Sequence, residues 1–502
     1  MYKAMIFDMD GTLIETNGLV MDLFTNLLEV HPSKVKIKSM DTHTLENKHY
    51  EEILRILYPD YNQTHLDALF QIHERIIHKH LKLRPNLLQT LESLREMGLK
   101  LYCLTNKNRK IAVNQLAGLC IYHLFDGIIT LEDVERPKPD PEGLYKLMLE
   151  KKYSKHEMLF VGSGMNDGIC GKEATIKTVY MNHDKDDSKT IYFNDVLESF
   201  DKLIEYVKDY MPAGRINITK KAYITMLQLT DLSLGNPVND AKTKRLLTRI
   251  IHNEKPDLIV LTGDQVAQET SLLRYQALIV CMEAFKTPWT FVFGDHEYQN
   301  LSDFNAFEQL LKTAKYLIFK KGSSSMGLFN FFIEIRSERK TNGLLFFMDS
   351  HIKDVYLIEK QLKTGVGSIK ENQLKWYDKV VNQYHFDYEK IPSNLIFSHI
   401  PPYEFSEVLK ENKDSYQGLY LMTPNTPPIK SKLIEYLKKQ RALGFFVGHD
   451  CYNDFQFYNE GVLFGYGRTT GYKANDTHEI KRGGRVIKLQ KSGVLSTYIT
   501  NT

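Results

Sequence analysis

Closely spaced cysteines and long apolar runs are both missing from this sequence of 502 residues. The cysteines are few and widely scattered, at Cys103, Cys120, Cys170, Cys281 and Cys451. They form neither a disulfide framework nor a CxxC metal knuckle. No apolar run approaches the roughly 20 residues that cross a bilayer, and the N-terminus, MYKAMIFDMDGT, has no signal-peptide core. We therefore expect a cytoplasmic protein with no membrane partner.

An excess of charge of one sign is also missing. The chain has 65 Lys+Arg and 62 Asp+Glu, which leaves a formal net charge of +3. Nucleic-acid binders usually carry a stronger basic surplus, so we expect no nucleic-acid partner. A content of 42% hydrophobic and 25% charged residues is typical of globular proteins. The length exceeds that of one ordinary domain, roughly 100–200 residues, and predicts two or three domains.

The first half of the chain alternates short apolar runs with helical patterns. The runs are too short for helices and are typical of buried parallel strands; they lie at 4–8, 99–105, 126–130, 158–162 and 177–181. Residues 85–98 show a helical pattern that ends at Gly98, a plausible C-cap. Strand–helix alternation predicts an α/β domain with a doubly wound parallel sheet. Open sheets of this kind bind ligands at the carboxyl ends of their strands.

Polar motifs follow the predicted strands in a fixed order: FDMDGT, LTN, KPDP and VGSGMND. Together they resemble the four motifs of the haloacid dehalogenase-like phosphatases. The resemblance covers about residues 1–208, and we assign residues 1–210 to this domain. It implies that residues 15–84, which are rich in Leu, Ile and His, form the small helical cap of that family.

The resemblance also implies the chemistry. Asp8 would be the nucleophile that forms an aspartyl-phosphate, and Asp10 would act as general acid and then base. Thr105 and Lys138 would hold the phosphoryl oxygens, with Lys138 offsetting the carboxylates. Mg²⁺ would bind Asp8 and the backbone carbonyl of Asp10.

One position departs from the family pattern. The fourth motif normally begins with an acidic metal ligand, and here Ser163 stands in its place. The second acid of that motif, Asp167, is kept and would support the metal site from behind. Because Mg²⁺ prefers charged oxygens, a hydroxyl should weaken its binding. A retained fold with little phosphatase activity is the alternative interpretation.

The junction between the halves combines a helical pattern with chain breakers. Residues 195–210 have apolar residues at helical spacing and predict the closing helix of the first domain. Pro212 and Gly214 follow. We therefore predict a linker at 211–221 and a second domain at 222–502.

The second half again places polar residues after apolar runs, but of other types. Asp and His predominate, in LTDLSLG, LTGDQV, FGDHEYQN, FSHIPPYEF and VGHDCYNDF. Single Asp and His residues at successive strand ends are what a metal site on a sheet edge requires. Imidazole and carboxylate together suit Zn²⁺, Mn²⁺ or Fe.

This order of motifs resembles the calcineurin-like metallophosphoesterases over about residues 222–502. The ending, GHDCYNDF, YGRTTGY and RGGRVIKL, resembles the branch of small purple-acid-phosphatase-like enzymes. The resemblance implies a two-layered β-sandwich flanked by helices. It also implies two metals that share a hydroxide and clamp phosphate oxygens.

Each ligand role is carried over from that family. Asp264 would bridge the two metals, Asp231 would belong to the first, and Asp295, His399 and His449 would complete the second. His296 would lie near the leaving group as a proton donor or charge stabiliser.

Two departures remove imidazoles from the first metal. Ser233 stands for the His of the DxH motif, and Cys451 stands for the last His of GHDH. Cys451 as a thiolate can still ligate Zn²⁺, but Ser233 is a poor ligand. A third departure, Asp for Asn at position 295, keeps an oxygen ligand. We predict about one tightly held metal per chain, bound through His399 and His449.

Three functions remain open at this point. The first is a metal-dependent phosphatase acting on a phosphorylated substrate through at least one half. The second is a catalytically impaired pseudophosphatase that binds a phosphorylated ligand or partner. The third is a scaffold of two interaction modules. The sequence does not name the substrate.

Overall fold

The computed structural model divides the chain into two compact units, Met1–Lys208 and Asp209–Thr502. Parts of the predicted cap, at 16–17 and 34–49, lie outside the residues that the structure describes. The described residues are 2–15, 18–33, 50–183, 185–266, 272–300, 303–322, 326–338, 340–351, 353–358, 361–388, 390–411, 416–472 and 480–501.

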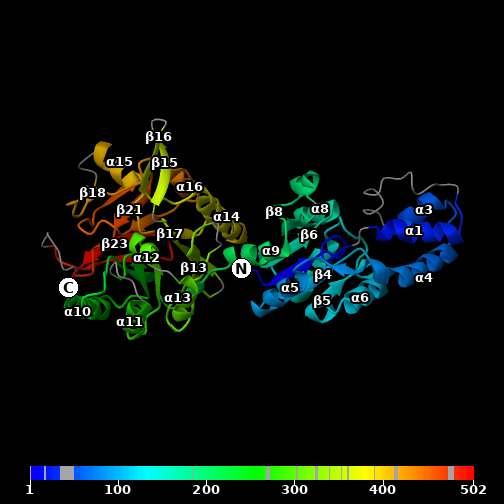
Figure 1. Ribbon diagram of the computed structural model, residues 1–502, viewed down its shortest axis with the longest axis horizontal. Coiled ribbons are helices and arrows are strands. Elements are labelled where there is room, and N and C mark those ends of the chain that lie inside the picture. Colours follow the sequence, from blue (N-terminus) through cyan, green and yellow to red (C-terminus); the bar gives the residue numbers. More distant parts are fainter. Residues whose placement is uncertain are drawn as a thin grey trace. The chain divides into compact units, whose positions relative to one another are not determined.

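A six-stranded sheet forms the centre of the first unit. Its order is β5 (Gly127–Ile129), β4 (Lys100–Leu104), β1 (Ala4–Phe7), β6 (Met158–Gly162), β7 (Lys177–Met181) and β8 (Asp195–Leu197). Every neighbouring pair is parallel. The apolar runs of the sequence thus form the predicted doubly wound sheet, with β1 at its centre (Figure 1).

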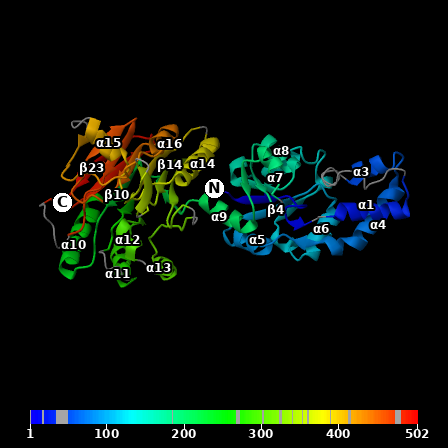
Figure 2. The same ribbon diagram turned by 45° about the horizontal axis from the view of Figure 1, so that its top comes forward.

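Helices cover both faces of this sheet. Figure 2 shows α7 (Glu142–Lys151) and α8 (Met165–Glu173) on one face, and α5 (Leu87–Glu96) and α6 (Arg109–Gly118) on the other. Apolar side chains of the strands are buried beneath them, among them Ile6, Leu104 and Phe160. Because both faces are covered, the central strands β1 and β6 are apolar along their whole length.

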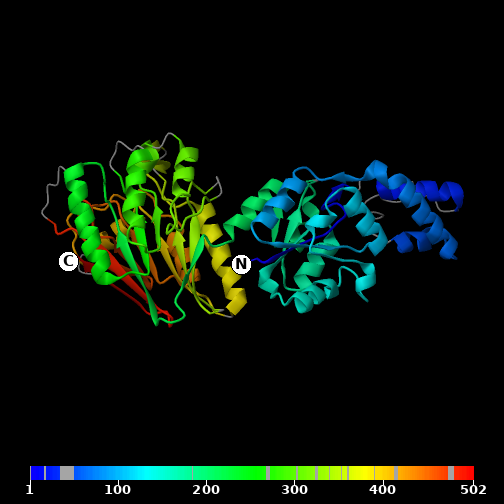
Figure 3. The ribbon, with the colours of Figure 1, turned by 90° about the horizontal axis from the view of Figure 1, so that it is seen from below.

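A separate helical group is inserted between β1 and β4. It contains α1 (Leu19–Val30), α3 (Tyr50–Leu57) and α4 (Gln63–His80), which lie together at one end of the unit (Figures 1 and 3). Leu19, Leu23 and Leu27 recur every four residues along α1 and are buried in a core of their own. The short strands β2 (Ile14–Glu15) and β3 (Lys82–Leu83) pair where the chain leaves and re-enters the sheet domain.

Two sheets build the second unit. The five-stranded sheet has the order β12 (Trp289–Val292), β11 (Leu258–Thr262), β10 (Tyr223–Leu229), β22 (Gly484–Gln490) and β23 (Leu495–Thr500). The eight-stranded sheet has the order β18 (Tyr416–Gln417), β20 (Gln456–Asn459), β21 (Val462–Tyr466), β19 (Gly444–Val447), β17 (Ser393–Phe397), β14 (Lys340–Phe347), β13 (Phe331–Ser337) and β9 (Gly214–Asn217). A hairpin, β15 (Lys353–Ile358) and β16 (Gln361–Val366), is separate.

Helices flank the two sheets on opposite sides (Figure 2). One side carries α10 (Pro237–Glu254), α11 (Leu272–Glu283), α12 (Asp295–Asn300) and α13 (Phe304–Leu311), and the other carries α14 (Glu371–Tyr388), α15 (Glu404–Glu411) and α16 (Leu433–Lys439). A core drawn from both sheets lies between, including Leu227, Leu261, Phe347 and Phe397. None of the helices within the described ranges combines the length and the apolarity that a membrane span needs.

The junction differs from the sequence prediction in two ways. Residues 195–210 were predicted as one helix, but they form β8 and then α9 (Phe200–Asp209). Residues 211–221 were predicted as a linker, but they contain β9, which pairs in parallel with β13. The breakers Pro212 and Gly214 therefore mark a turn into an edge strand of the second unit. Local pattern missed this strand because its partner lies more than a hundred residues further along the chain.

Candidate functional site

The motif loops of the first unit meet because their strands are neighbours in the sheet. Asp8 follows β1, Thr105 follows β4 and Ser163 follows β6, and β1 pairs with both other strands. Lys138 comes from the loop after β5, the next strand outward. Parallel strands end at one edge, so four segments far apart in the sequence supply one site.

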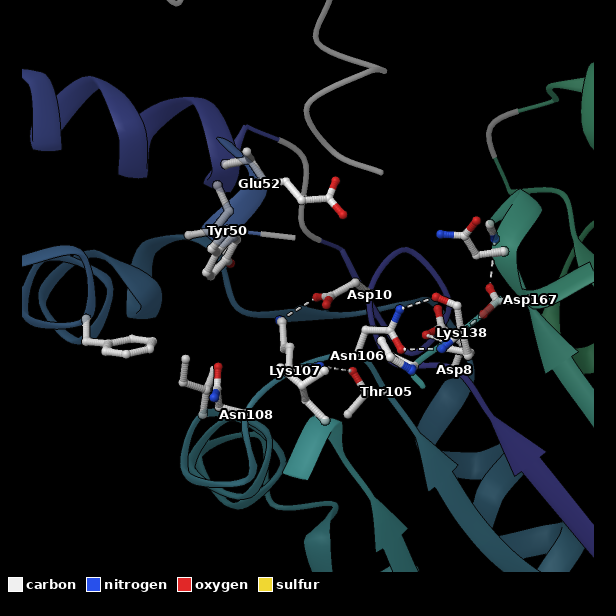
Figure 4. Close-up of a pocket in the computed structure, with 18 of the residues that line it drawn as sticks. Asp8, Asp10, Tyr50, Glu52, Thr105, Asn106, Lys107, Asn108, Lys138 and Asp167 are labelled. Atoms are coloured by element: carbon white, nitrogen blue, oxygen red, sulfur yellow. Dashed lines mark hydrogen bonds and ion pairs between the residues drawn. The ribbon is translucent and has the colours of Figure 1, made fainter. Parts of the chain in front are cut away.

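Lys138 lies beside Asp8 and Asp167 in this site (Figure 4). Its Nζ donates to Asp8 Oδ1 and to Asp167 Oδ1, both at 2.6 Å, and all three residues are buried. Burial alone would lower the pKa of Lys138, but Asp167 and Asp8 raise it above its ordinary value. Burial, together with the charge of Asp8, raises the pKa of Asp167 to about 6. The ammonium group thus holds two carboxylates together that would otherwise repel.

Asn106 fixes the loop that carries Lys138. Its Nδ2 donates to the Lys138 carbonyl at 2.8 Å, and its Oδ1 accepts from the Lys138 backbone N–H at 3.0 Å. Thr105, the preceding residue, is buried and lines the same pocket. The LTN motif therefore supplies both a hydroxyl for the pocket and a clamp on the lysine loop.

Ser163 occupies the position where the family pattern has an acid. Its Oγ donates to the Asp10 carbonyl at 3.3 Å and accepts from Thr12 Oγ1 at 3.0 Å. Thr12 Oγ1 also lies 3.0 Å from Asp8 Oδ2. Both Mg²⁺ ligands implied by the resemblance, the Asp8 carboxylate and the Asp10 carbonyl, thus lie within one small network. This set fits Mg²⁺, which takes one or two carboxylates and completes its shell with water and substrate oxygens.

Asp167 is more fully engaged than the sequence indicated. Its Oδ2 accepts from the backbone N–H groups of Ser163 and Gly164, at 3.1 and 2.9 Å, and its Oδ1 accepts from Lys138. These bonds tie the start of α8 to the loop after β6. We therefore interpret Asp167 as a support for the site, in line with its implied place behind the metal.

Sequence reasoning missed Lys107 in this pocket. Its Nζ donates to Asp10 Oδ1 at 2.5 Å (Figure 4). The same Nζ donates to Gln115 Oε1 at 2.7 Å. The available signal was its place directly after Thr105-Asn106. Helices α1, α3 and α4 close the other side of a cavity of about 390 Å³, with Tyr50 and Glu52 facing it. Asp10 is thus held by a lysine at the boundary between sheet and cap.

In the second unit, the two sheets supply different kinds of side chain. Asp231, Asp264 and Asp295 follow β10, β11 and β12 of the five-stranded sheet. His399 and His449 follow β17 and β19 of the eight-stranded sheet, which are parallel neighbours. The carboxylates therefore come from one layer and the imidazoles from the other.

His399 is the centre of this second cluster. Its Nε2 lies 3.3 Å from Asp295 Oδ1, 3.2 Å from His449 Nδ1 and 3.6 Å from Asp264 Oδ1. Its Nδ1 lies 2.8 Å from the Thr262 carbonyl, so Nδ1 carries the hydrogen and Nε2 can ligate. Asp295, His399 and His449 offer ligand atoms within 4.8 Å of one another. This donor set fits a transition metal such as Zn²⁺.

Charge at this cluster also favours a cation. Burial would lower the pKa of His399, but Asp264 and Asp295 raise it to about 10. Burial opposes ionisation of Asp295, yet hydrogen bonds from His399 and His449 hold its pKa below the ordinary value. Without a metal, positive charge is thus kept on the imidazole. A metal ion would replace that proton.

Asp231 and Cys451 lie beside this cluster but outside it. The Cys451 Sγ is 3.4 Å from Asp231 Oδ1, and Thr230 Oγ1 donates to Asp231 Oδ2 at 2.7 Å. Neither residue belongs to the groups of three or more potential ligands found among the described residues. Ser233 donates its backbone N–H to the Asp264 carbonyl at 2.9 Å. At the first metal site implied by the resemblance, the Cys451 thiol and the Asp231 carboxylate are therefore in contact with each other.

His296 belongs to a second potential ligand group, with Asp264 and Asp295. Its Nε2 lies 3.6 Å from Asp264 Oδ2. Two further residues support the cluster and were not predicted. Glu297 is buried and accepts from the backbone N–H groups of Gly294 and Asp264, at 2.6 and 3.0 Å. Asn425 Nδ2 lies 3.1 Å from His449 Nε2. Glu297 directly follows His296, whereas Asn425 lies outside the quoted motifs and has no sequence signal.

Comparison with known proteins agrees with this geometry. Residues 5–181 match the family model described as haloacid dehalogenase-like hydrolase, and residues 224–453 match that of the calcineurin-like phosphoesterases. The chain is 31% identical over 221 residues to pyrophosphatase PpaX of Halalkalibacterium halodurans, covering 42% of this chain and 94% of PpaX. It is 27% identical over 278 residues to phosphatase DCR2 of Saccharomyces cerevisiae, covering 48% of this chain. The chain spans 46% of the length of DCR2.

Among solved structures, a putative haloacid dehalogenase-like hydrolase from Bacteroides fragilis is similar to this chain. The two are 24% identical with a TM-score of 0.36, and the match covers 40% of this chain and 100% of that one.

Proposed function

We propose that the first unit of this chain is a Mg²⁺-dependent phosphomonoesterase. The premise is that the chain belongs to the haloacid dehalogenase-like hydrolases through residues 5–181 and to the calcineurin-like phosphoesterases through residues 224–453. Both families are phosphoric ester hydrolases, and the chain is an enzyme of this class. The observation that carries the proposal is the contact of buried Lys138 with Asp8, beside Asp10 in one cavity.

The first half-reaction uses Asp8 as the nucleophile. A carboxylate oxygen of Asp8 attacks phosphorus, the bond from phosphorus to the leaving oxygen breaks, and an aspartyl-phosphate forms. Asp10 gives its proton to the leaving oxygen. Lys138 and the Thr105 hydroxyl hold the other phosphoryl oxygens, where negative charge gathers.

The second half-reaction restores the enzyme. Asp10, now a carboxylate, takes a proton from water, and that water's oxygen attacks the phosphorus of the aspartyl-phosphate. The bond to Asp8 breaks, and inorganic phosphate leaves. The Asp8 carboxylate and the Asp10 carbonyl would hold Mg²⁺, which would supply positive charge to offset that of the phosphoryl group. Ser163 contributes a neutral oxygen there, so the chain should hold Mg²⁺ weakly.

The cavity lining favours an organic phosphate over pyrophosphate. Apolar side chains surround much of the cavity of about 390 Å³, namely Leu19, Val20, Leu66, Phe70, Ile111 and Leu131. Pyrophosphate would leave this surface uncovered, whereas an apolar leaving group would bury it. The relative PpaX is named as a pyrophosphatase, an enzyme that hydrolyses a phosphoanhydride. For this chain we propose a phosphomonoester with a partly apolar leaving group as the substrate. We expect its kcat/KM to exceed that of pyrophosphate.

Covalent labelling tests the mechanism. The full-length Asp10→Asn chain is incubated with ³²P-labelled 4-nitrophenyl phosphate and Mg²⁺, then quenched in acid. We expect label on Asp8, because a good leaving group needs no acid and the missing base slows the second half-reaction. The Asp8→Asn/Asp10→Asn chain should carry none. Equal label on both chains, or label on another residue, would contradict the mechanism.

For the second unit, we propose a site with about one tightly held metal. Asp264, Asp295, His399 and His449 would hold it, because these ligand types suit a transition metal. The separation of Asp231 and Cys451 from this cluster supports one ion over two. One metal held by these residues would supply a cation that lowers the pKa of water, which would permit slow hydrolysis. Metal-dependent binding of a phosphorylated ligand without turnover is the second candidate, favoured by the same separation.

Elemental analysis of paired variants tests the metal count. We expect about one equivalent in the full-length chain, unchanged in Cys451→Ala and lost in His449→Ala. Two equivalents that fall to one in Cys451→Ala would support sulfur ligation and overturn the single-metal proposal. No metal after supplementation would remove the enzymatic interpretation of this unit.

A further inference from the structure

A series of polar contacts, partly buried at Asp10 and fully buried at its far end, runs from Asp10 to the cap. Lys107 Nζ contacts Asp10 Oδ1 at 2.5 Å and Gln115 Oε1 at 2.7 Å, and Gln115 Nε2 lies 3.3 Å from His73 Nε2. Gln115 lies on α6, beside the sheet, and His73 lies on cap helix α4. Only 2% of Gln115 and 3% of His73 is exposed, so the contact between these two side chains is shielded from water.

The chemistry of the three groups fixes the direction of every bond. The Lys107 ammonium has donors only, so it must face the oxygen of the Gln115 amide. The amide nitrogen of Gln115 is then the atom that faces His73. That nitrogen is a donor, so His73 Nε2 accepts and its hydrogen sits on Nδ1. The series therefore has one consistent arrangement, in which each group orients the next.

The far end of the series returns to the pocket. The His73 ring lies 6.1 Å, between centroids, from the ring of Tyr50. Tyr50 is on α3 and lines the cavity opposite Asp10. The contacts therefore connect Asp10, at one end, with Tyr50, at the other. A leaving group that touches the cap at Tyr50 would contact the far end of this series.

We propose that Lys107 is a positioning residue for the Asp10 carboxyl, and that Gln115 and His73 make this positioning depend on the cap. The inference rests on the proposed function, because it assigns to Asp10 the transfer of a proton to the leaving oxygen. Lys107 acts by orienting Asp10, and this orientation is correct when α4 is docked against α6. A substrate that holds α4 against α6 thereby brings the Asp10 carboxyl into the orientation for proton transfer.

Two substrates that differ by one nitro group separate this role from substrate binding. Phenyl phosphate releases a poor leaving group that needs a proton, whereas 4-nitrophenyl phosphate releases a good one that needs little help. All rates are measured with Mg²⁺ on the full-length chain carrying His399→Ala, so that the second unit's cluster does not contribute. For Lys107→Met we expect kcat on phenyl phosphate to fall about 100-fold, with KM within about threefold. The fall on 4-nitrophenyl phosphate should be about tenfold smaller. Lys107→Arg, which keeps a cation, should restore most of the rate.

The cap end is tested by non-additivity. Gln115→Leu and His73→Leu should each lower kcat on phenyl phosphate about tenfold. The double variant should have the same kcat as either single variant, because both substitutions interrupt the same series of contacts. His65→Leu is the matched control, since it makes the same change on α4 at a residue that contacts Asn62, Tyr58 and His31 instead of Gln115. It should leave kcat unchanged. Variants are compared only where their thermal unfolding matches that of the parent chain.

The outcomes separate the inference from the proposed function. A raised KM with unchanged kcat in Lys107→Met would make Lys107 a binding residue and overturn the inference. Additive losses in Gln115→Leu and His73→Leu, or equal losses on both substrates, would show independent structural effects and also overturn it. Failure of Asp8→Asn to abolish turnover in the same background would instead refute the proposed function, whatever the Lys107 variants do.

Discussion

The two units of the chain arrange acidic residues around different cations. In the first unit, Asp8, Asp167 and Asp10 contact the ammonium groups of Lys138 and Lys107. In the second, Asp264 and Asp295 face the imidazoles of His399 and His449. A lysine holds its proton at neutral pH, whereas an imidazole can yield its proton to a metal. From this difference we expect the first site, which compensates its own charge, to bind Mg²⁺ loosely, and the second site to bind a metal ion more tightly.

The backbones of the two sites differ as well. Among the described residues, four non-glycine residues of the second site have φ in the left-handed region: Asp231 (52°), Ser233 (47°), Asp264 (53°) and His449 (75°). None of the residues proposed for the first site has such a φ. At Gly263, with φ of 90°, an added Cβ would lie 2.1 Å from His399 Nδ1. Strained backbone of this kind clusters at functional sites, so the second site is held in place before a ligand arrives.

The largest effect is expected at Lys138. Lys138→Met removes the ammonium between Asp8 and Asp167 and should lower kcat in the first unit by about 100-fold or more, because charge at the phosphoryl oxygens is no longer offset. Mg²⁺-dependent hydrolysis of 4-nitrophenyl phosphate measures this. Lys146→Met is the control, since Lys146 lies on α7 and donates to the Asp133 carbonyl. Equal losses in both variants would mean that Lys138 is merely structural.

An intermediate effect is expected from pH on the metal-free chain. The pKa of His399 is raised from 6.5 to about 10 in the folded state. Protonated His399 therefore adds stability that is fully present below pH 6.5 and is lost as pH rises through about 10. We expect the metal-free second unit to lose on the order of 2 kcal/mol over this range. The metal-loaded chain should not, because its imidazole is already neutral.

Urea unfolding at several pH values measures this dependence. His399→Ala should remove the slope, and His252→Ala, a change at an exposed residue of α10, should keep it. A metal-free chain that gains stability toward alkaline pH would contradict the charge assignment.

The smallest effect is expected at Ser163. Ser163→Asp places a carboxylate beside Asp8 and the Asp10 carbonyl and should raise Mg²⁺ affinity severalfold, because Mg²⁺ prefers charged oxygens. The Mg²⁺ concentration that gives half-maximal turnover measures this. Ser163→Asn, which has a similar shape without charge, should not improve affinity. Equal responses of both variants would mean that charge at this position does not limit Mg²⁺ binding.

The fold followed from the sequence where signals were local. The strands β6 and β7 have the predicted limits, since each is a short apolar run bounded by polar residues. Strand β9 was missed because an exposed edge strand of mixed composition is defined only by its partner β13. Strand β8 was hidden inside an apolar pattern that also suits a helix.

The sequence allowed most residues of the two sites to be predicted, but not how these residues are arranged in space. The strand-end rule brings Asp8, Thr105 and Ser163 together, because their strands are neighbours. That carboxylates and imidazoles of the second site come from different sheets depends on sheet packing, which no local pattern encodes. Lys107 was missed because its partners, Asp10 and Gln115, come from separate segments.

The most direct test compares Mg²⁺-dependent phosphomonoester turnover in two full-length variants, Asp8→Asn and His399→Ala. The account predicts that Asp8→Asn loses this turnover, while His399→Ala keeps the rate of the unaltered chain. Turnover that survives Asp8→Asn and disappears in His399→Ala would place the activity in the second unit and contradict the account.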